Sequence, residues 1–306
     1  MPSSSNKQNK KTEIAKTQPW IGRFAPSPTG NLHLGSLVAA VASYMIAKQK
    51  GGQWLVRIED LDPPREIEGA TKSILTSLED FGLFWDGSVT YQSQRNVVYQ
   101  QRLEELISQK IVYQCDCSRR MIEDRNYGIY DGFCRSRALA PKTDQATRIK
   151  FESGFENFDD HILGKCQFDS DADKQDFIIK RRDGLFAYQL AVVADDIDQK
   201  INHVVRGQDI LDSTPRQNYL YHCFNHAIPE YFHVPLVTDN KGVKFSKRSA
   251  AESVKKNQAS ALLLKALQHL GQNIDHTMQN AKPFEIVQYY EKHWQFEKIK
   301  PMNERK

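Results

Sequence analysis

The sequence predicts an α/β fold built on a parallel sheet. The apolar run from Trp20 to Ala25 is typical of a short buried strand. Apolar residues then recur at helical spacing, at Leu37, Val38, Val41, Tyr44 and Met45. Gly51 and Gly52 end this helix, and Gln53 to Ile58 is a second strand-like run. A strand, a helix and a second strand in this order favour two parallel strands joined by a crossover helix.

The turn between that strand and that helix has the composition of a nucleotide-binding loop. From Gly22 to Ser36 it reads Gly-Arg-Phe-Ala-Pro-Ser-Pro-Thr-Gly-Asn-Leu-His-Leu-Gly-Ser. The two prolines hold the turn extended, while Gly30 and Gly35 let the backbone approach a ligand at the helix N-terminus. Free amide N–H groups and the helix dipole favour a phosphate at this position. His33 can add a donor to that phosphate.

Glu59 directly follows the second predicted strand. Because ligands of open parallel sheets bind beyond the carboxyl ends of the strands, we expect Glu59 to lie beside the loop and to bind a ligand. The alternative is that Glu59, Asp60 and Asp62 cap the next helix, and for Asp62 the cap is the preferred interpretation.

Two further helices are predicted in the first half of the chain. The first ends at Gly82 and has an apolar face made of Ile67, Ile74, Leu75, Leu78 and Phe81. The second runs from about Gln94 to Gln109.

The second half begins with a predicted hairpin, in which Asp183 and Gly184 form the turn between two strand-like runs. His203 to Gly207 is another short strand. An N-cap, a proline at the first helical position and a capping-box glutamine then start a helix, at Thr214, Pro215 and Gln217. Amphipathic patterns at 261–270 and 283–290 predict two last helices.

Three cysteines lie within twenty residues of one another, at Cys115, Cys117 and Cys134. Thiolates bind zinc tightly and a structural zinc site has four ligands, so one position is open. No histidine lies between these cysteines, and the candidates for the fourth ligand are Tyr130, Asp116 and Asp131. The alternative is three reduced structural cysteines. Cys166 and Cys223 stand apart and are interpreted as small buried hydrophobic residues.

A basic loop is predicted from Asp239 to Arg248, where four cations fall within eight residues beside Gly242 and Ser246. Such a loop can clamp phosphates. The alternative is a basic turn without a ligand, and the preceding nucleotide-type loop favours the phosphate clamp.

The composition is that of a globular chain without a membrane span. Of its 306 residues 40% are hydrophobic and 26% are charged, and the formal net charge is +4. This mild excess of positive charge permits nucleic acid as a partner without arguing strongly for it. No apolar run is long enough to cross a bilayer, and no signal peptide begins the chain, so we expect a cytoplasmic protein. Residues 1–18 carry four lysines and almost nothing apolar, which predicts a disordered tail.

His33-Leu34-Gly35-Ser36 and Lys244-Phe245-Ser246-Lys247-Arg248 together resemble the HIGH and KMSKS signatures of class I aminoacyl-tRNA synthetases. Within that class, residues 23–30, 57–62 and 205–211 look like the glutamyl branch, and the resemblance spans about Trp20 to Ala250. The chain departs from the signatures at Ser36, Phe245 and Arg248, changes that are common in glutamyl-type enzymes.

A short glutamyl-type chain with a Cys-x-Cys and Tyr-x-x-x-Cys pattern resembles the glutamyl-queuosine tRNA(Asp) synthetase family, whose members attach glutamate to the queuosine base of tRNA(Asp). Full glutamyl-tRNA synthetases carry a long anticodon-binding region, whereas 58 residues follow Arg248 here. The alternatives are a truncated glutamyl-tRNA synthetase that charges a tRNA 3′ end, and a catalytically idle tRNA-binding module.

This resemblance implies a domain organisation. Residues 19–110 and 191–250 would form the two halves of a Rossmann-type catalytic domain, with the KMSKS-like loop in the second half. Residues 111–190 would form an inserted zinc-bearing α+β subdomain of the acceptor-binding type. Residues 251–306 would form a short helical segment with no anticodon-binding domain. The protein is expected to be a monomer.

The resemblance also implies a ligase that activates L-glutamate with ATP and Mg²⁺ and then uses tRNA(Asp) carrying queuosine as acceptor. Its catalytic residues would be His33 and Lys247. The residues implied to bind ATP are Pro26, Gly30, His33, Gly35, Ser36, Lys244, Ser246, Lys247 and Arg248. One Zn²⁺ is implied on Cys115, Cys117 and Cys134, with Tyr130 as the fourth ligand.

Free glutamate carries two carboxylates and one ammonium, and Arg23, Arg206 and Glu59 form the complementary set of charges. The full expected glutamate set is Arg23, Ala25, Ser27, Glu59, Tyr188 and Arg206. The alternative for the two arginines is a structural ion pair, and for Tyr188 it is a half-buried sheet residue at the end of the hairpin.

Overall fold

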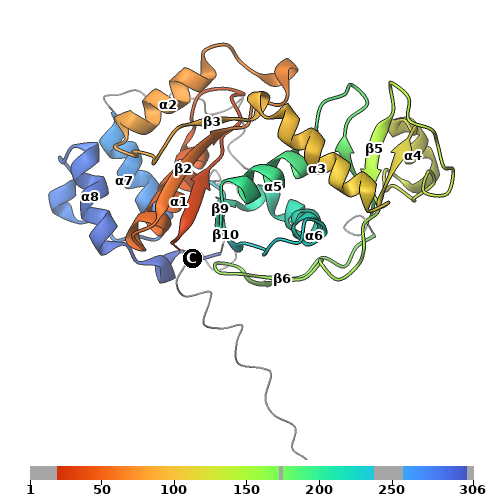
Figure 1. Cartoon of the computed structure of the whole chain (residues 1–306). Helices are drawn as coiled ribbons and strands as arrows, with labels where there is room; N and C mark the ends of the chain where they lie inside the picture. Colours follow the sequence, from red (N-terminus) through yellow and green to blue (C-terminus); the bar gives the residue numbers. More distant parts are fainter. Residues whose placement is uncertain (1–18, 172–174, 238–257, 302–306) are drawn as a thin grey trace, which may run out of the picture.

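The computed structural model describes residues 19–171, 175–237 and 258–301. Its main sheet has the strand order β3-β2-β1-β9-β10-β6-β7, and all neighbours are parallel except β6 and β7. The strands are β1 (Ile21–Phe24), β2 (Gln53–Ile58), β3 (Thr90–Tyr91), β6 (Phe158–Asp160), β7 (Gly164–Cys166), β9 (His203–Gly207) and β10 (Glu230–Val234). The predicted parallel α/β fold is therefore confirmed (Figure 1).

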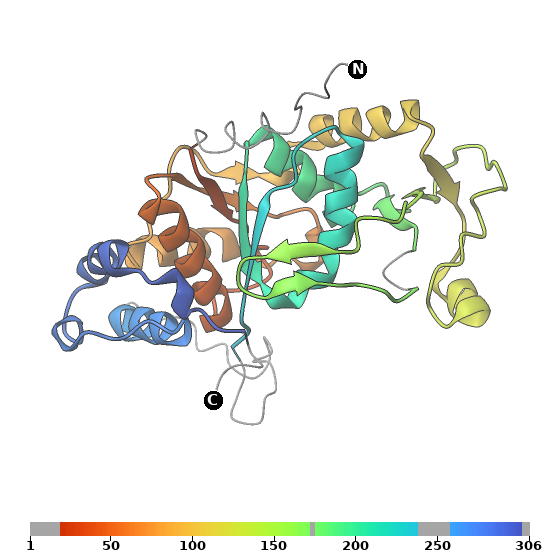
Figure 2. The same cartoon turned by 90° about the horizontal axis from the view of Figure 1, so that it is seen from below.

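Two strand–helix–strand units build the centre of this sheet. Helix α1 (Leu34–Gln49) joins β1 to β2, and α6 (Thr214–Cys223) joins β9 to β10. Helix α1 buries ten of its sixteen residues, because it lies between the sheet and the two last helices, α7 (Ala259–His269) and α8 (Pro283–His293). Figure 2 shows these three helices together on one side of the sheet.

The other side carries a second core. Helices α3 (Asn96–Ser108), α5 (Tyr188–Asp198) and α6 pack together there through apolar side chains. Helix α2 (Ala70–Asp80) packs through Ile74 and Leu78 on the hydrophobic core that surrounds α1. Short 3₁₀ turns occupy Pro63–Arg65, Gln92–Gln94, Gln208–Ser213, His276–Met278 and Phe296–Lys298.

A smaller antiparallel sheet lies at the far end of the molecule from α7 and α8 (Figure 1). It has the order β4-β5-β8 and is accompanied by α4 (Arg119–Asn126). Its strands are β4 (Val112–Cys115), β5 (Ala146–Ile149) and β8 (Phe177–Lys180). The range 111–190 is thus divided, because β6 and β7 from its middle join the main sheet.

Two local predictions are wrong. The turn at Asp183 and Gly184 forms, with the Arg181 N–H donating to the Leu185 carbonyl at 2.8 Å, and Phe186 pairs antiparallel with Lys180. The predicted second strand stops there, because the chain from Tyr188 onward is helix α5. A buried apolar run such as 190–194 fits a strand and a fully buried helix equally well. Ile67 precedes α2 and is 56% exposed, so it does not belong to the apolar face of that helix.

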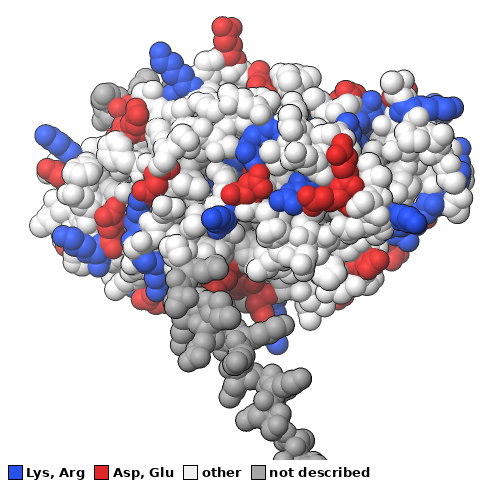
Figure 3. Space-filling model, in the orientation of Figure 1, with Lys and Arg blue, Asp and Glu red and all other residues white. Residues whose placement is uncertain are grey.

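The surface carries both signs of charge. On the face shown in Figure 3, lysine and arginine side chains are interspersed with aspartate and glutamate. Among the described residues, no helix has the length and apolar character that crossing a membrane requires.

Candidate active site

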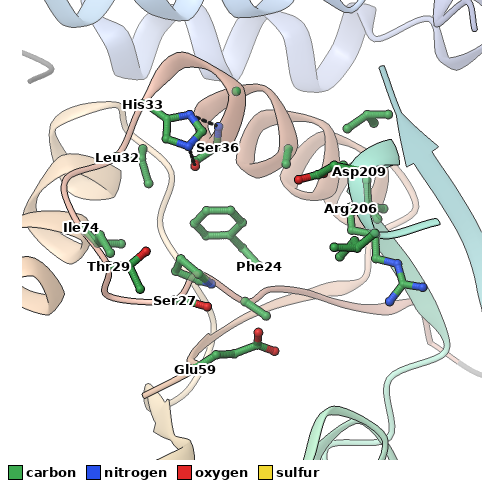
Figure 4. A pocket seen from close by; sticks show the side chains of 18 of the residues that line it. Phe24, Ser27, Thr29, Leu32, His33, Ser36, Glu59, Ile74, Arg206 and Asp209 are labelled. Carbon is green, nitrogen blue, oxygen red and sulfur yellow. Dashed lines mark hydrogen bonds between the residues drawn. The ribbon is translucent and has the colours of Figure 1, made fainter. Parts of the chain in front are cut away.

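A cavity of about 540 Å³ opens beyond the carboxyl ends of β1, β2 and β9, and this volume is in the range of small-molecule sites. It gathers eleven of the predicted site residues. They are Arg23, Ala25, Pro26, Ser27, Gly30, His33, Gly35, Ser36, Glu59, Tyr188 and Arg206. Lys244, Ser246, Lys247 and Arg248 lie outside the described residues. In Figure 4, His33 and Ser36 lie at one end of the view and Glu59 at the other.

The loop end of the cavity is built around the N-terminus of α1. His33 is the N-cap of this helix, and its Nδ1 accepts the Ser36 N–H at 3.2 Å. The Ser36 hydroxyl lies 3.1 Å from Nε2 of the same ring. A Cβ at Gly35 would come within 3.2 Å of the His33 imidazole, so the absence of a side chain at Gly35 leaves room for the ring. Gly30 has a φ of +144°, which side-chain-bearing residues rarely adopt.

The opposite end has a charged floor, by which we mean Arg23, Arg57, Glu59 and Asp196. Glu59 follows β2, and its Oε1 lies 3.5 Å from Nη2 of Arg57. This oxygen is buried and has no hydrogen-bond partner among the described residues. Burial raises the pKa of Glu59 to about 7, against the opposing pull of Arg57 and Arg23. The carboxylate at the cavity wall is therefore only partly compensated.

Asp196 of α5 joins the two arginines of the floor. Its Oδ1 accepts from Arg23 Nε at 3.0 Å and from Arg57 Nη1 at 2.7 Å, and its Oδ2 accepts from Arg23 Nη2 at 3.2 Å. All three side chains are almost fully buried. Burial alone would raise the pKa of Asp196, but Arg23 and Arg57 outweigh it and hold this pKa below its usual value. Arg23 thus makes an ion pair while it lines the cavity, as the alternative interpretation expected.

Arg57 and Asp196 hold Arg23 and Glu59 at the cavity, and the sequence alone did not indicate them. The contact joins residues 139 positions apart in the chain. A strand is predicted after the turn at Asp183 and Gly184, and this prediction concealed the helical face that carries Asp196. A signal was available, because Tyr188, Val192 and Asp195 to Asp196 recur at the spacing of helical turns.

Arg206, at the end of β9, is held differently. Its Nη1 donates to Gln217 Oε1 at 2.6 Å and its Nη2 to Thr214 Oγ1 at 2.7 Å. The predicted capping box is therefore wrong: Ser213 is the N-cap of α6, without a side-chain hydrogen bond, and Pro215 keeps its place in the first turn. The side chains of Thr214 and Gln217 face Arg206 because this arginine is buried between β9 and α6 and needs acceptors.

Tyr188 lies on the first turn of α5 and lines the cavity, so it is a helix residue and not a sheet residue. Burial raises the pKa of its hydroxyl, and the nearby Glu59 acts in the same direction. Its phenol therefore stays protonated and can donate or accept a hydrogen bond in the cavity.

The cysteine cluster, by which we mean Cys115, Cys117, Cys134 and Tyr130, lies between β4 and α4 and the loop that follows. The three Sγ atoms are buried and lie within 4.8 Å of one another. Tyr130 is also buried, and its hydroxyl accepts the Cys134 N–H at 3.0 Å. These donors have the composition of a structural zinc site, with a phenol in the place of a fourth thiol.

The two acidic candidates for the fourth ligand have partners of their own. Asp131 accepts from Arg125 Nε at 2.9 Å, and Asp116 Oδ1 accepts from Arg137 Nη1 at 2.6 Å and from the Cys134 thiol at 3.5 Å. Each thiol in turn has an arginine beside it. The distances are 3.4 Å from Arg125 to Cys117, 3.6 Å from Arg137 to Cys134 and 3.3 Å from Arg148 to Cys115. Arg148 also stacks 3.8 Å from the centre of the Tyr130 ring. Cys166 is buried, as predicted for an isolated thiol, while Cys223 is only partly buried.

The parallel sheet with a His-capped helix at its carboxyl edge is an α/β arrangement whose ligands bind at that edge. A family profile described as "tRNA synthetases class I (E and Q), catalytic domain" matches residues 21–304. The fold agrees with a solved glutamate tRNA ligase from Elizabethkingia meningosepticum, with a TM-score of 0.76 at 24% identity. That likeness covers 92% of this chain and 66% of the other chain.

Curated relatives narrow the class further. A glutamyl-Q tRNA(Asp) synthetase from Yersinia pestis is 44% identical over 94% of this chain and 89% of its own length. One from Ectopseudomonas mendocina is 47% identical over 90% of this chain and 93% of its own. One from Escherichia coli O157:H7 is 45% identical over 92% and 91%. The chain belongs to this family of class I tRNA synthetases.

Proposed function

We propose that this protein activates L-glutamate with ATP and transfers it to the queuosine base of tRNA(Asp). The observation that carries the proposal is the cavity, which brings Arg206 and Glu59 together with the His33 turn. The names of relatives that are 44–47% identical support the same acceptor and the same amino acid. We place the reaction in the cytoplasm, where ATP and tRNA are available, and expect a monomer.

The glutamate subsite is proposed at the charged floor and Arg206. The carboxylate of Glu59 lines the cavity and suits the ammonium of glutamate, since Arg57 compensates its charge only in part and an ammonium donates up to three hydrogen bonds. Arg206 suits a carboxylate, and Tyr188 can complete the contacts. We assign Arg23 to the same subsite, together with the backbone at Ala25 and Ser27, although its charge is shared with Asp196.

The ATP subsite is proposed at the loop end. Pro26, Gly30, Gly35 and Ser36 would lie along the nucleotide, and the positive end of the α1 dipole favours phosphate there. His33 would face the phosphates, and Mg²⁺ would accompany them. Lys247, with Lys244, Ser246 and Arg248, would neutralise charge on the departing pyrophosphate.

In the proposed reaction a carboxylate oxygen of glutamate attacks the α-phosphorus of ATP, and the bond to pyrophosphate breaks. Glutamyl-adenylate and pyrophosphate result. A hydroxyl of the cyclopentene diol of queuosine then attacks the activated carbonyl, and AMP leaves. Because neither step requires a covalent enzyme intermediate, the side chains act by positioning and electrostatic stabilisation.

The cysteine cluster is proposed to hold one Zn²⁺ through Cys115, Cys117, Cys134 and Tyr130. The donor set fits, because three buried thiols lie together beside the Tyr130 hydroxyl, while Asp131 is engaged by Arg125. Asp116 is paired with Arg137, although its Oδ1 also lies 3.5 Å from the Cys134 thiol. A bound zinc ion would cross-link β4 to the loop after α4 and so stabilise this part of the fold.

The first test is glutamate-dependent exchange of labelled pyrophosphate into ATP with no tRNA present. We expect exchange with glutamate and none without it. The second test is transfer of labelled glutamate to tRNA(Asp) that carries queuosine, with tRNA(Asp) from a queuosine-deficient strain as the control. Periodate is a poor control on its own, because it destroys the diol of queuosine as well as the 3′ terminal diol.

Two results would contradict the proposal. Label on tRNA(Glu) but not on queuosine-containing tRNA(Asp) would mean that the enzyme charges a tRNA 3′ end. A folded protein with neither exchange nor transfer would mean an idle tRNA-binding module.

A further inference from the structure

The third nitrogen of Arg206 is held by a histidine. Arg206 Nε donates to Nε2 of His233 at 2.9 Å, so all three of its bonds go to uncharged acceptors. No carboxylate within 19–171, 175–237 or 258–301 forms an ion pair with Arg206. A guanidinium has five N–H groups, so one remains on each terminal nitrogen, the number that a bidentate carboxylate accepts.

His233 can accept from Arg206 only if its Nε2 carries no proton. Its Nδ1 lies 2.7 Å from Asp160 Oδ2, so the hydrogen-bond network assigns the proton to Nδ1 and the lone pair to Nε2. Burial lowers the pKa of His233 to about 4, which keeps the ring uncharged at neutral pH. His233 is therefore an oriented, neutral acceptor for Arg206.

Asp160 is itself fixed by the turn between β6 and β7. Its Oδ1 accepts the N–H groups of Ile162 and Leu163, both at 2.9 Å, and its Oδ2 accepts the His233 N–H at 3.1 Å. Asp160 and His233 are almost fully buried. The carboxylate thus cannot turn away from the ring without leaving several donors unpaired.

Arg23 and Arg206 differ in the charge of their hydrogen-bond acceptors. Arg23 donates to the carboxylate of Asp196, which cancels much of its charge. Arg206 keeps its charge, so an anionic group in the cavity gains a strong interaction with it. A neutral amide of the same shape offers a single acceptor oxygen and leaves one of the two remaining N–H groups unmatched.

We propose that His233 and Asp160 are positioning residues that orient Arg206 as an uncompensated cation and so make the cavity select a carboxylate over an amide. This role rests on the proposed activation of glutamate and names the origin of its specificity. Neither residue needs to touch the substrate, since both act through Arg206.

The test compares two substitutions at His233, each of which keeps one of the two hydrogen bonds of the ring, to Arg206 or to Asp160. H233Q retains an acceptor near the position of Nε2, while H233N retains a donor toward Asp160 but has no acceptor that reaches Arg206. D160N removes the charge that fixes the tautomer of His233. The measurement is pyrophosphate exchange at saturating ATP, giving kcat and KM for glutamate and for glutamine. The exposed His226 supplies the control, H226N, which should behave like the wild type.

We expect H233N to raise the KM for glutamate about tenfold to a hundredfold while kcat changes less than about threefold, because ground-state binding is lost. H233Q should lie much closer to the wild type. The ratio of kcat/KM for glutamate over glutamine should fall in H233N and D160N. Melting curves show which variants are folded at the assay temperature. If H233N is not folded, D160N against H233Q makes the same comparison.

Equal KM values for H233N and H233Q, or for D160N and H233Q, would overturn the positioning role, since a purely structural role does not distinguish them. A fall in kcat with an unchanged KM would overturn it as well. If the wild type shows no glutamate-dependent exchange, the proposed function fails and this role fails with it, whereas an active wild type with unaltered variants overturns the positioning role alone.

Discussion

The charged floor and the cysteine cluster both bury ionisable groups beside arginines, but they are assembled over different distances in the chain. In the floor, Arg23 meets Asp196 across 173 residues and Arg57 meets it across 139. In the cluster, the arginine beside each thiol lies 3, 8 or 33 residues away. The floor therefore depends on the whole fold. The cluster is a local structure, and the spacing of its cysteines in the sequence indicates it.

The charges of the two regions also differ in balance. The floor supplies its own counterions, because Asp196 faces two arginines. The cluster brings three thiols within 4.8 Å of one another beside the phenol of Tyr130, and its arginines donate to the thiols without a carboxylate at the centre. We therefore expect mutations in the floor to lower the free energy of unfolding of the whole protein. Mutations in the cluster should lower its metal content.

The largest effect is expected from D196N. It leaves Arg23 and Arg57 buried without their shared carboxylate, and breaking such a buried pair costs about 3–5 kcal/mol. Denaturant unfolding should show this loss in the free energy of unfolding. D198N is the matched control, since Asp198 lies on the same helix but is 35% exposed in its pairs with Arg95 and Arg102, so its loss should be under about 1 kcal/mol. Equal losses of unfolding free energy in D196N and D198N would show that the buried ion pairs of Asp196 contribute no more than the exposed pairs of Asp198.

The second effect is metal content. Wild-type protein is expected to contain about one zinc ion per chain by elemental analysis, as a four-ligand structural site requires. C117S should lose most of it during dialysis against a mild chelator, whereas C166S, which alters an isolated thiol, should keep it. Full zinc retention by C117S would remove the cluster from consideration as a metal site.

A smaller effect is expected from the arginines around the cluster. R148Q removes a donor to Cys115 and the stacking on Tyr130, and groups around metal ligands typically contribute about tenfold to a hundredfold in affinity. Competition with a chromogenic chelator measures this change. R137Q, at a side chain 35% exposed, should change the affinity less. The reverse order would mean that burial does not decide the strength of these contacts.

The smallest effect is the pH dependence of the floor. In the proposed glutamate subsite the ionised form of Glu59 would bind the ammonium of glutamate, and burial raises the pKa of Glu59 to about 7. Lowering the pH through this value protonates the carboxylate, so the KM for glutamate should rise about tenfold from pH 8 to pH 6. E59Q should have a high KM that is flat over this range. A wild-type KM that falls on acidification would contradict the assignment of Glu59.

Local patterns predicted the elements around the cavity well. The bounds 53–58 and 203–207 of β2 and β9 were predicted residue for residue, because both strands are short apolar runs with clear ends. The cavity residues from Arg23 to Ser36 came from one contiguous loop and a family resemblance. The three cysteines were visible from their spacing alone.

The residues that hold the cavity together were not predictable in the same way. His233 and Asp160 are 73 positions apart, and nothing in either neighbourhood indicates the other. Thr214 and Gln217 matched a capping box, yet the buried guanidinium of Arg206 was the stronger demand on their side chains. Tertiary contacts between distant segments overrode the local motif in each case.

The position of β6 and β7 has a consequence for anyone who wishes to shorten or exchange the distal part of this enzyme. These strands are encoded between β5 and β8 of the small sheet, but they pair with β10 and carry Asp160. Deletion of residues 111–190 would remove Asp160, which orients His233 behind Arg206, together with the small β4-β5-β8 sheet. A graft that retains both 158–166 and α5 from Tyr188 onward keeps Asp160 and the cavity lining, so the boundaries of an interchangeable module here are discontinuous in the gene.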